Sequence, residues 1–416
     1  MNRKIIALAL TAALTAGLCG ISVFAEQAEG VPQTLAETVP ADSPAGPDNG
    51  ADYTPDPVGQ ASFSAVEQRI RRNNLQALAL DMQIAALESI DYEDYLEDLR
   101  RGLNQLAGVQ WMMLDMGQGS SYSYAQLDQS YTALRAQFDA IRDGDLQKDN
   151  AGVIRQLENV KDQLVMGGET MYLAILSMES QEDSLERQLT ALDRTLKELR
   201  LRHELGHIST LQLKEAEAGR SALVSGLETL RMNLRVYKTQ LEVLMGAEQT
   251  GSIRLGGVPQ VTQAQLSAMD LEKDLASAKE ASYELFDAHK TYKDTQDAYH
   301  GLGAQTPMLD AEYGWPAAQY TYNNAVQNYE LKFRTLYAQV KDYKQVLEAA
   351  KVTLSSKEDA YAAADLKYQQ GNLSKNAFLS AAEEVVAAEE AVRSAENDLF
   401  TAYNSYCWAA ESGILN

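Results

Sequence analysis

Residues 201–213 read LRHELGHISTLQL, and residues 366–378, which lie 165 positions later, read LKYQQGNLSKNAF. Both stretches hold a glycine that is followed two and three residues later by an apolar residue and a serine. Glycine commonly ends a helix in a left-handed conformation, and serine is a preferred N-cap of the next helix. The two stretches therefore predict two helix-turn-helix tips, which contain Gly206, Ile208, Ser209, Gly371, Leu373 and Ser374.

The same shift of 165 residues relates longer segments on both sides of these tips. Apolar residues recur at steps of three and four, which is typical of coiled-coil seams. Residues 171–244 align with residues 336–409 without a gap, so the chain is an internal tandem repeat. We expect an all-α fold in which long antiparallel coiled-coil helices form two tandem helical hairpins. The first arms of these hairpins are predicted as continuous helices over about 153–205 and 317–370.

The sequence HELGH at residues 203–207 also matches the HExxH pattern of zinc metallopeptidases. In that pattern two histidines on one helix face bind zinc, and the glutamate activates a water molecule. The second repeat keeps the glycine but replaces the three zinc-related residues with Tyr368, Gln369 and Asn372. We therefore favour a helical tip and predict no catalytic residue, metal or cofactor. A zinc metallopeptidase, with Glu228 as a third ligand, is kept as a minor alternative.

The segments outside the repeats indicate export. In residues 1–25, Arg3 and Lys4 precede an apolar run that ends in Val23-Phe24-Ala25, which predicts a signal peptide. Residues 26–61 are rich in proline and acids and predict a disordered linker. The remaining expected parts are helical repeat 1 over 62–246, an inter-repeat linker over 247–261 and helical repeat 2 over 262–416. Pro259, Pro307 and Pro316 are predicted to mark joints between helices.

Charge and cysteine content narrow the classes of partner. The chain has 59 acidic residues against 36 Lys and Arg, with a net charge of −23, so nucleic acid is not expected as a partner. Cys19 belongs to the predicted signal peptide, and the mature protein then keeps only Cys407, which forms no internal disulfide.

This duplicated layout resembles the TolC-like outer-membrane efflux proteins. In each repeat a long helix ends at a glycine-serine turn, and a return helix closes at Gly246 or Gly413. The stretch FSAVEQRIRRNNLQALALDMQIAAL, at residues 63–87, is also similar to the first helix of that family. The resemblance implies an α-barrel protomer, a homo-oligomer that is a trimer, and tips that dock on a periplasmic adaptor, or membrane-fusion protein, coupled to an inner-membrane pump. It also implies a place in the cell envelope, outer membrane-associated or extracytoplasmic.

The chain departs from the family at both ends of its helices. Family tips often carry an aspartate six residues after the glycine, where this chain has Gln212 and Ala377. The family has two membrane strands in each repeat, but the connection Gly301–Pro316 is too short for them. The longer connection of repeat 1 has a helical pattern with breaks near Gly117 and Asp143. The sequence thus lacks recognisable membrane strands.

Trp111 and Trp315 lie near these far connections. We favour an interpretation in which they fill the core where helices end, and the alternative is contact with lipid or a partner. For the whole chain we expect a TolC-like component of an efflux or export system, which forms a helical conduit or docks an adaptor to transport small molecules or proteins. The alternative is an exported coiled-coil structural or surface protein without transport activity.

Overall fold

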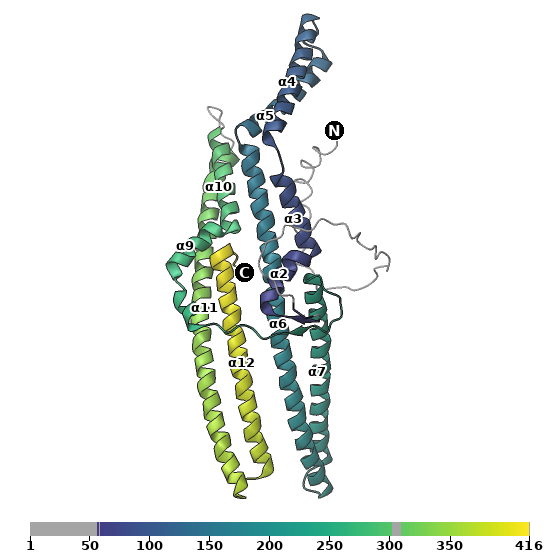
Figure 1. The fold of residues 1–416 in the computed structure, drawn as a ribbon, viewed down its shortest axis with the longest axis vertical. Helices are drawn as coiled ribbons and strands as arrows, with labels where there is room; N and C mark the ends of the chain where they lie inside the picture. Colours follow the sequence, from purple (N-terminus) through teal and green to yellow (C-terminus); the bar gives the residue numbers. More distant parts are fainter. Residues whose placement is uncertain (1–55, 58, 302–308, 416) are drawn as a thin grey trace. The chain divides into compact units, whose positions relative to one another are not determined.

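The computed structural model describes residues 56–57, 59–301 and 309–415 (Figure 1). The predicted signal peptide, most of the predicted linker and Pro307 lie outside these residues. In chain order the elements are β1 (Gln60–Ala61), α2 (Phe63–Asn73), α3 (Leu75–Glu88), α4 (Tyr92–Asp115), α5 (Tyr122–Arg142), α6 (Asp145–Glu204), α7 (Thr210–Leu244), β2 (Arg254–Leu255), α8 (Gln263–Ala268), α9 (Leu271–Ala281), α10 (Tyr283–Gly301), α11 (Leu309–Gln369) and α12 (Lys375–Ser412).

The all-α prediction is confirmed, because the described elements are helices apart from one short strand pair. β1 and β2 pair in parallel, with Gln60 opposite Arg254 and Ala61 opposite Leu255. Within the described part of the chain, no helix combines the length and the apolar character needed to cross a membrane. The chain divides into two compact units, whose described parts are residues 78–158 and residues 56–57, 59–77, 159–301 and 309–415. The predicted division into repeats and linkers stays a prediction.

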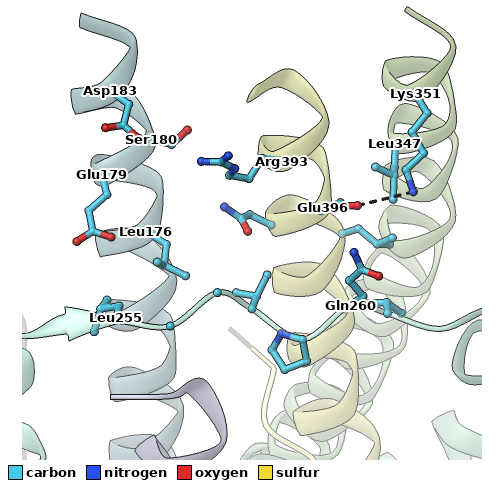
Figure 2. A pocket seen from close by; sticks show the side chains of 17 residues that line it. Leu176, Glu179, Ser180, Asp183, Leu255, Gln260, Leu347, Lys351, Arg393 and Glu396 are labelled. Carbon is cyan, nitrogen blue, oxygen red and sulfur yellow. Dashed lines mark ion pairs between the residues drawn. The ribbon is translucent and has the colours of Figure 1, made fainter. Parts of the chain in front are cut away.

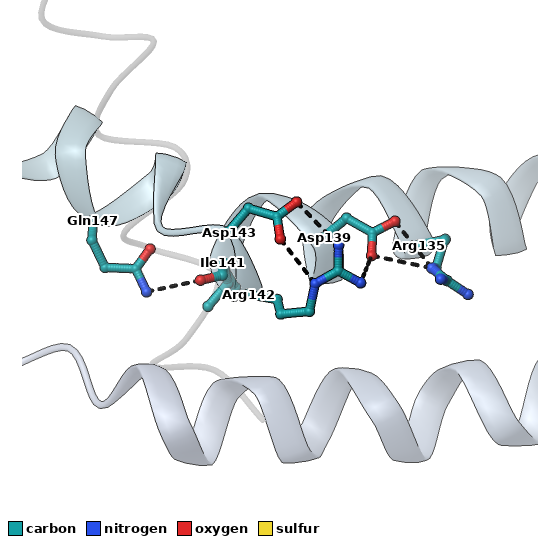
Figure 3. Close-up of polar contacts among 6 residues, drawn as sticks. All are labelled: Arg135, Asp139, Ile141, Arg142, Asp143 and Gln147. Carbon is teal, nitrogen blue, oxygen red and sulfur yellow. Dashed lines mark hydrogen bonds and ion pairs between the residues drawn. The ribbon is translucent and has the colours of Figure 1, made fainter.

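The first unit contains a helical hairpin made by α4 and α5. Leu99, Leu103 and Met113 are buried on α4, and Ile141 is buried on α5. The breaks predicted near residues 117 and 143 are confirmed, since α4 ends at Asp115 and α5 ends at Arg142. At the second break Arg142 forms ion pairs with Asp139 and Asp143 (Figure 3). Gln147 Nε2 donates a 2.9 Å hydrogen bond to the carbonyl of Ile141 and so bridges the turn.

The second unit contains the two predicted hairpins, α6 with α7 and α11 with α12, as two antiparallel pairs (Figure 1). Ion pairs establish the order α7, α6, α12, α11 in one row. Arg231 of α7 pairs with Glu182 and Glu186 of α6. The α6 and α12 helices are joined by Arg187–Glu390 and Arg194–Glu383, and α12 and α11 by Lys357–Glu384 and Lys351–Glu396. In this row α7 and α11 are the two outer helices.

The predicted seams are buried between these helices. Leu227, Leu234 and Leu241 are buried on α7, and seven residues of α12 are buried, among them Ala388, Ala395, Leu399, Ala402 and Tyr406. The long first arms begin earlier than predicted, at Asp145 and Leu309, and Pro316 lies inside α11. The prediction of a joint at Pro316 is therefore wrong. A proline near the start of a long helix removes one backbone hydrogen bond, and the 61-residue helix continues through it.

Each repeat also contains a kink that the periodicity did not reveal. The 11-residue helices α2 and α9 are each followed by a single capping residue, Asn74 or Ser282, before the next helix begins. Each capping side chain accepts a hydrogen bond from the amide three residues later: Asn74 Oδ1 from Ala77 at 3.1 Å, and Ser282 Oγ from Leu285 at 3.3 Å. The two kinks therefore start α3 and α10 in the same way.

The glycines that close the return helices pack against these kinks. Gly246 has a φ of 63°, and a Cβ there would lie 2.6 Å from the carbonyl oxygen of Asn73. Gly413 has a φ of 68°, and its Cβ would overlap the backbone of Ser282. Positive φ and close backbone approach both favour glycine. The endings that carried the family resemblance thus have the same structural role in both repeats.

Candidate functional site: the two helix-turn-helix tips

The first tip joins α6 to α7. Gly206 has a φ of 74°, and its amide donates to the carbonyl of His203 at 2.9 Å. The amide of His207 donates to the carbonyl of Arg202 at 2.8 Å, which completes the hydrogen-bond pair of a Schellman helix ending. Ser209 then caps α7 in a capping box with Gln212. The glycine and the serine therefore act as the sequence predicts.

The second tip repeats this backbone geometry. Gly371 has a φ of 76°, and its amide donates to the carbonyl of Tyr368 at 2.9 Å. The amide of Asn372 donates to the carbonyl of Lys367 at 2.8 Å. Ser374 Oγ accepts a 3.2 Å hydrogen bond from the amide of Ala377 and caps α12. Two turns with different side chains thus share one backbone path.

The predicted tip residues divide into buried and accessible members. Ile208 and Leu373 are half-buried, whereas both glycines and both serines are exposed. Sequence reasoning missed the exposed leucines Leu201, Leu205, Leu211 and Leu366 near the turns, which give the two tips an apolar outer surface. These leucines do not belong to the series of apolar residues, spaced by three and four, that forms the seams. The periodic pattern therefore did not indicate a role for them.

The geometry contradicts the premise of the zinc interpretation. Its two histidines must lie on one continuous helix, but α6 ends at Glu204 and the positive φ of Gly206 turns the chain between His203 and His207. Glu228 lies 18 residues into α7 from Thr210, or about 27 Å along the axis at 1.5 Å per residue, and it pairs with Arg231. In the described part of the chain, no group of three or more His, Cys, Asp or Glu residues is placed to hold a metal ion.

His203 instead faces the return helix, as Tyr368 does in the other repeat. His203 Nε2 lies 3.1 Å from Thr210 Oγ1. The Tyr368 ring stacks on Phe378, with 4.8 Å between ring centroids and 10° between ring planes. His203 and Tyr368 therefore occupy equivalent positions, and each contacts the return helix of its own hairpin.

Polar contacts between the hairpins hold the two tips at the same end of the second unit. Near the turns, Asn376 Nδ2 of α12 donates a 3.1 Å hydrogen bond to Glu198 of α6. Farther from the tips, the buried Glu169 carboxylate of α6 accepts 2.7 Å hydrogen bonds from Asn404 and from the indole of Trp408 on α12. Burial raises the pKa of Glu169 above its ordinary value. These contacts fix α6 against α12.

The segment between the repeats crosses the same pair of helices. Residues 255–261 lie over α6 and α12 and enclose a hollow of about 440 Å³ (Figure 2). Glu179 and Glu396 on its walls are ion-paired with Lys238 at 2.7 Å and Lys351 at 3.7 Å. Tyr172 anchors this segment, because its hydroxyl donates to the carbonyl of Gly256 at 2.6 Å. We interpret the crossing as a structural strap.

The two tryptophans of the far connections have different surroundings. Trp111, on α4, is 73% exposed, so the prediction that it fills the core is wrong. The hairpin of α4 and α5 has one seam, and Trp111 lies off it. Trp315, near the start of α11, is half-buried, and its ring lies 6.2 Å from Tyr299 and 6.4 Å from His300 between centroids.

Chains with a similar arrangement of helices are found among solved structures. The outer membrane protein VceC of Vibrio cholerae aligns over 84% of this chain and 96% of its own, with 10% identity and a TM-score of 0.48. The CmeC outer membrane channel of Campylobacter jejuni aligns over 85% and 86%, with 11% identity and a TM-score of 0.42. No family model and no curated protein matches the chain.

Proposed function

We propose that this protein is a component of an efflux or export system in the cell envelope and forms a closed homo-oligomeric helical conduit. The observation that carries the proposal is the row of four long helices, whose outer members each have an apolar stripe opposite the buried seam. On α7 this edge contains Met232, Val236 and Val243, and on α11 it contains Val346 and Val352. These five side chains are between 47% and 72% exposed.

These stripes are suited to pair with each other in neighbouring copies. The α7 edge contains an apolar hollow of about 500 Å³ whose walls include Met171, Val236 and Val243. Exposed apolar stripes of this length are uncommon on monomers and mark interaction surfaces. Because the two edges lie at opposite ends of one row, α7 of one copy packs on α11 of the next in a head-to-tail contact. Repetition of such a contact produces a ring when the rotation closes.

The resemblance to TolC-like proteins supports three copies in this ring and a function in transport of small molecules or proteins. The tips formed by Gly206, Ile208 and Ser209 and by Gly371, Leu373 and Ser374 are then the surface that docks a periplasmic adaptor, which an inner-membrane pump drives. The match of backbone between the two tips supports this assignment. In a ring, paired tips of the same shape present a repeating docking surface to a symmetric adaptor. The protein has no enzymatic activity under this proposal.

Light scattering of the purified mature protein at micromolar concentration tests the oligomer. We expect the mass of three chains for the wild type and of one chain for Val236→Glu or Val352→Glu, with helix content unchanged in circular dichroism. Leu75→Glu is a matched control, since Leu75 is 77% exposed and lies outside both stripes. A monomeric wild type would favour the structural-protein alternative, and bound zinc in the purified protein would favour the peptidase.

A further inference from the structure

The distal end of the hairpin of α4 and α5 has an exposed apolar surface that the conduit does not use. We call it the apolar hairpin tip and define it as Val109, Trp111, Met112, Leu114, Met116 and Tyr122. Their exposed fractions range from 39% for Val109 to 79% for Tyr122. All six lie in the first compact unit.

The exposed residues surround the end of α4 and do not form one stripe. At about 100° per residue, the side chains at 109, 111, 112, 114 and 116 point in widely different directions around the helix axis. Met113, between them, is buried. A protein groove covers one face of a helix, through residues spaced by three, four and seven. The apolar side chains at the end of α4 point in several directions around the helix axis. All of them leave water at once when the end of the hairpin enters an apolar medium.

Charged side chains are also distributed unevenly along the hairpin, and few of them lie near its apolar tip. The 11 residues 91–101 hold seven charged side chains, whereas the 26 residues 102–127 hold one, Asp115. Charged residues make up 23% of the chain, a fraction that would place about six in such a stretch. The hairpin therefore has a charged stem and a nearly uncharged apolar end.

The composition and length of this end fit the boundary region of a bilayer. Tryptophan and tyrosine are enriched at membrane–water interfaces, and here Trp111 and Tyr122 are among the most exposed aromatic residues. The helical rise from Val109 to Met116 is about 10 Å at 1.5 Å per residue. Amphipathic segments that lie in the interface enter to a similar depth, about 5–10 Å.

We propose that the apolar hairpin tip inserts end-on into the interfacial region of a zwitterionic lipid surface. Residues 102–127 contain no Lys or Arg, and the chain has a net charge of −23, so electrostatic attraction to anionic lipids does not contribute. Burial of the apolar side chains drives the insertion. This inference is independent of the ring, because it concerns one hairpin of one chain.

Vesicles of phosphatidylcholine test the proposal with the full-length mature protein. We expect the wild type to sediment with sucrose-loaded vesicles, and Trp111→Ser/Met112→Ser/Met116→Ser to lower the partition coefficient at least about tenfold. Leu75→Ser, which removes an exposed leucine outside the hairpin, should bind like the wild type. Helix content measured by circular dichroism shows that the variants are folded.

A second measurement reports on Trp111 directly. Lipids with brominated acyl chains should quench part of the tryptophan fluorescence of the wild type, and Trp111→Phe should remove the quenched part while Trp315 and Trp408 continue to emit. Several results would overturn the proposal: no binding to phosphatidylcholine vesicles, binding to anionic vesicles alone, or equal binding by the triple variant. A monomer that binds lipid through the tip would contradict the ring but support this inference.

Discussion

Gly168 lies at a packing position where the two repeats exchange large and small residues. A Cβ at Gly168 would overlap Cδ1 of the fully buried Ile70 and lie 3.6 Å from its Cγ1. The shift of 165 places Phe333 at the position of Gly168, and the shift of 208 from α2 to α9 (271 − 63) places Ala278 at the position of Ile70. Phe333 and Ala278 are fully buried in one core cluster. Each repeat therefore fills this position with one large and one small side chain.

We predict that Gly168→Ala destabilises the protein and that Ile70→Val relieves the effect. Overpacking a buried position costs about 1–3 kcal/mol, and the higher helix propensity of alanine offsets about 1 kcal/mol of this. The net free energy of unfolding should fall by up to about 2 kcal/mol. Ile70→Val removes the Cδ1 atom that overlaps and alone costs about 0.5–1.5 kcal/mol. The loss in free energy of unfolding of the double variant should therefore be smaller than the sum of the two single losses, by about 1–2 kcal/mol.

Thermal unfolding followed by circular dichroism, at one protein concentration, measures these differences. Gly167→Ala is the matched control, because a Cβ at Gly167 meets no heavy atom within 4 Å. It should raise the melting temperature through helix propensity alone. Stabilisation by Gly168→Ala equal to that by Gly167→Ala, or additive effects of Gly168→Ala and Ile70→Val, would show that a Cβ at position 168 does not overpack Ile70.

Three further predictions concern other parts of the second unit. Glu242, whose carboxylate accepts hydrogen bonds from the amides of residues 250–253, has a pKa that burial acts to raise but that bonds from Gly251 and Thr250 hold below the ordinary value. The contribution of Glu242 to stability is therefore fully present above the ordinary glutamate pKa of about 4.3. It is lost as the pH falls through the lower pKa that Glu242 has in the folded protein. Glu242→Gln should therefore lower the melting temperature by more at pH 7 than at pH 3. Gly206→Val with Gly371→Val should cost about 1–3 kcal/mol at each tip, because valine is strained at positive φ. Hydrogen exchange at the two turns should accelerate, and binding to an immobilised adaptor hairpin from the same organism should weaken about tenfold or more, while the oligomeric mass stays unchanged; unchanged exchange and binding would contradict the tip assignment. His203→Ala with His207→Ala should leave mass and helix content intact, and about one zinc per wild-type chain that the double variant loses would contradict the helical tip.

The tips and the seams could be predicted because they depend on local chemistry that occurs twice. Gly206 and Gly371 each need a positive φ, and Ser209 and Ser374 each cap a helix. When the two repeats are aligned, these residues are shared while the residues of the HExxH pattern are not, so the alignment distinguishes a turn from a zinc site. The kinks at Asn74 and Ser282 were not visible because the two capping residues differ and follow a different shift, 208 residues, from that of the tips.

The surroundings of single side chains could not be predicted, since they depend on which helices lie beside them. Trp111 lies in an apolar run that suits a core, yet the Trp111 side chain lies off the seam that α4 shares with α5 and is 73% exposed. The hydrogen bonds of Glu169 to Asn404 and Trp408 join residues more than 230 positions apart, and no periodic pattern connects such positions. For the same reason the contact of Tyr172 with Gly256 had no signal in the sequence.

The central claim is that copies join head-to-tail, with α7 of one chain on α11 of the next, and one mixing experiment tests it directly. Val236→Glu disables only the α7 edge, and Val352→Glu disables only the α11 edge. Each variant alone should be monomeric, because every contact in a head-to-tail ring needs both edges. An equimolar mixture keeps one competent pair, α11 of the first variant with α7 of the second, and should form a complex of two chains and stop there. Light scattering that shows two chains in the mixture and one in each variant supports the ring. A mixture that stays monomeric, or either variant alone that retains the wild-type mass, would contradict it.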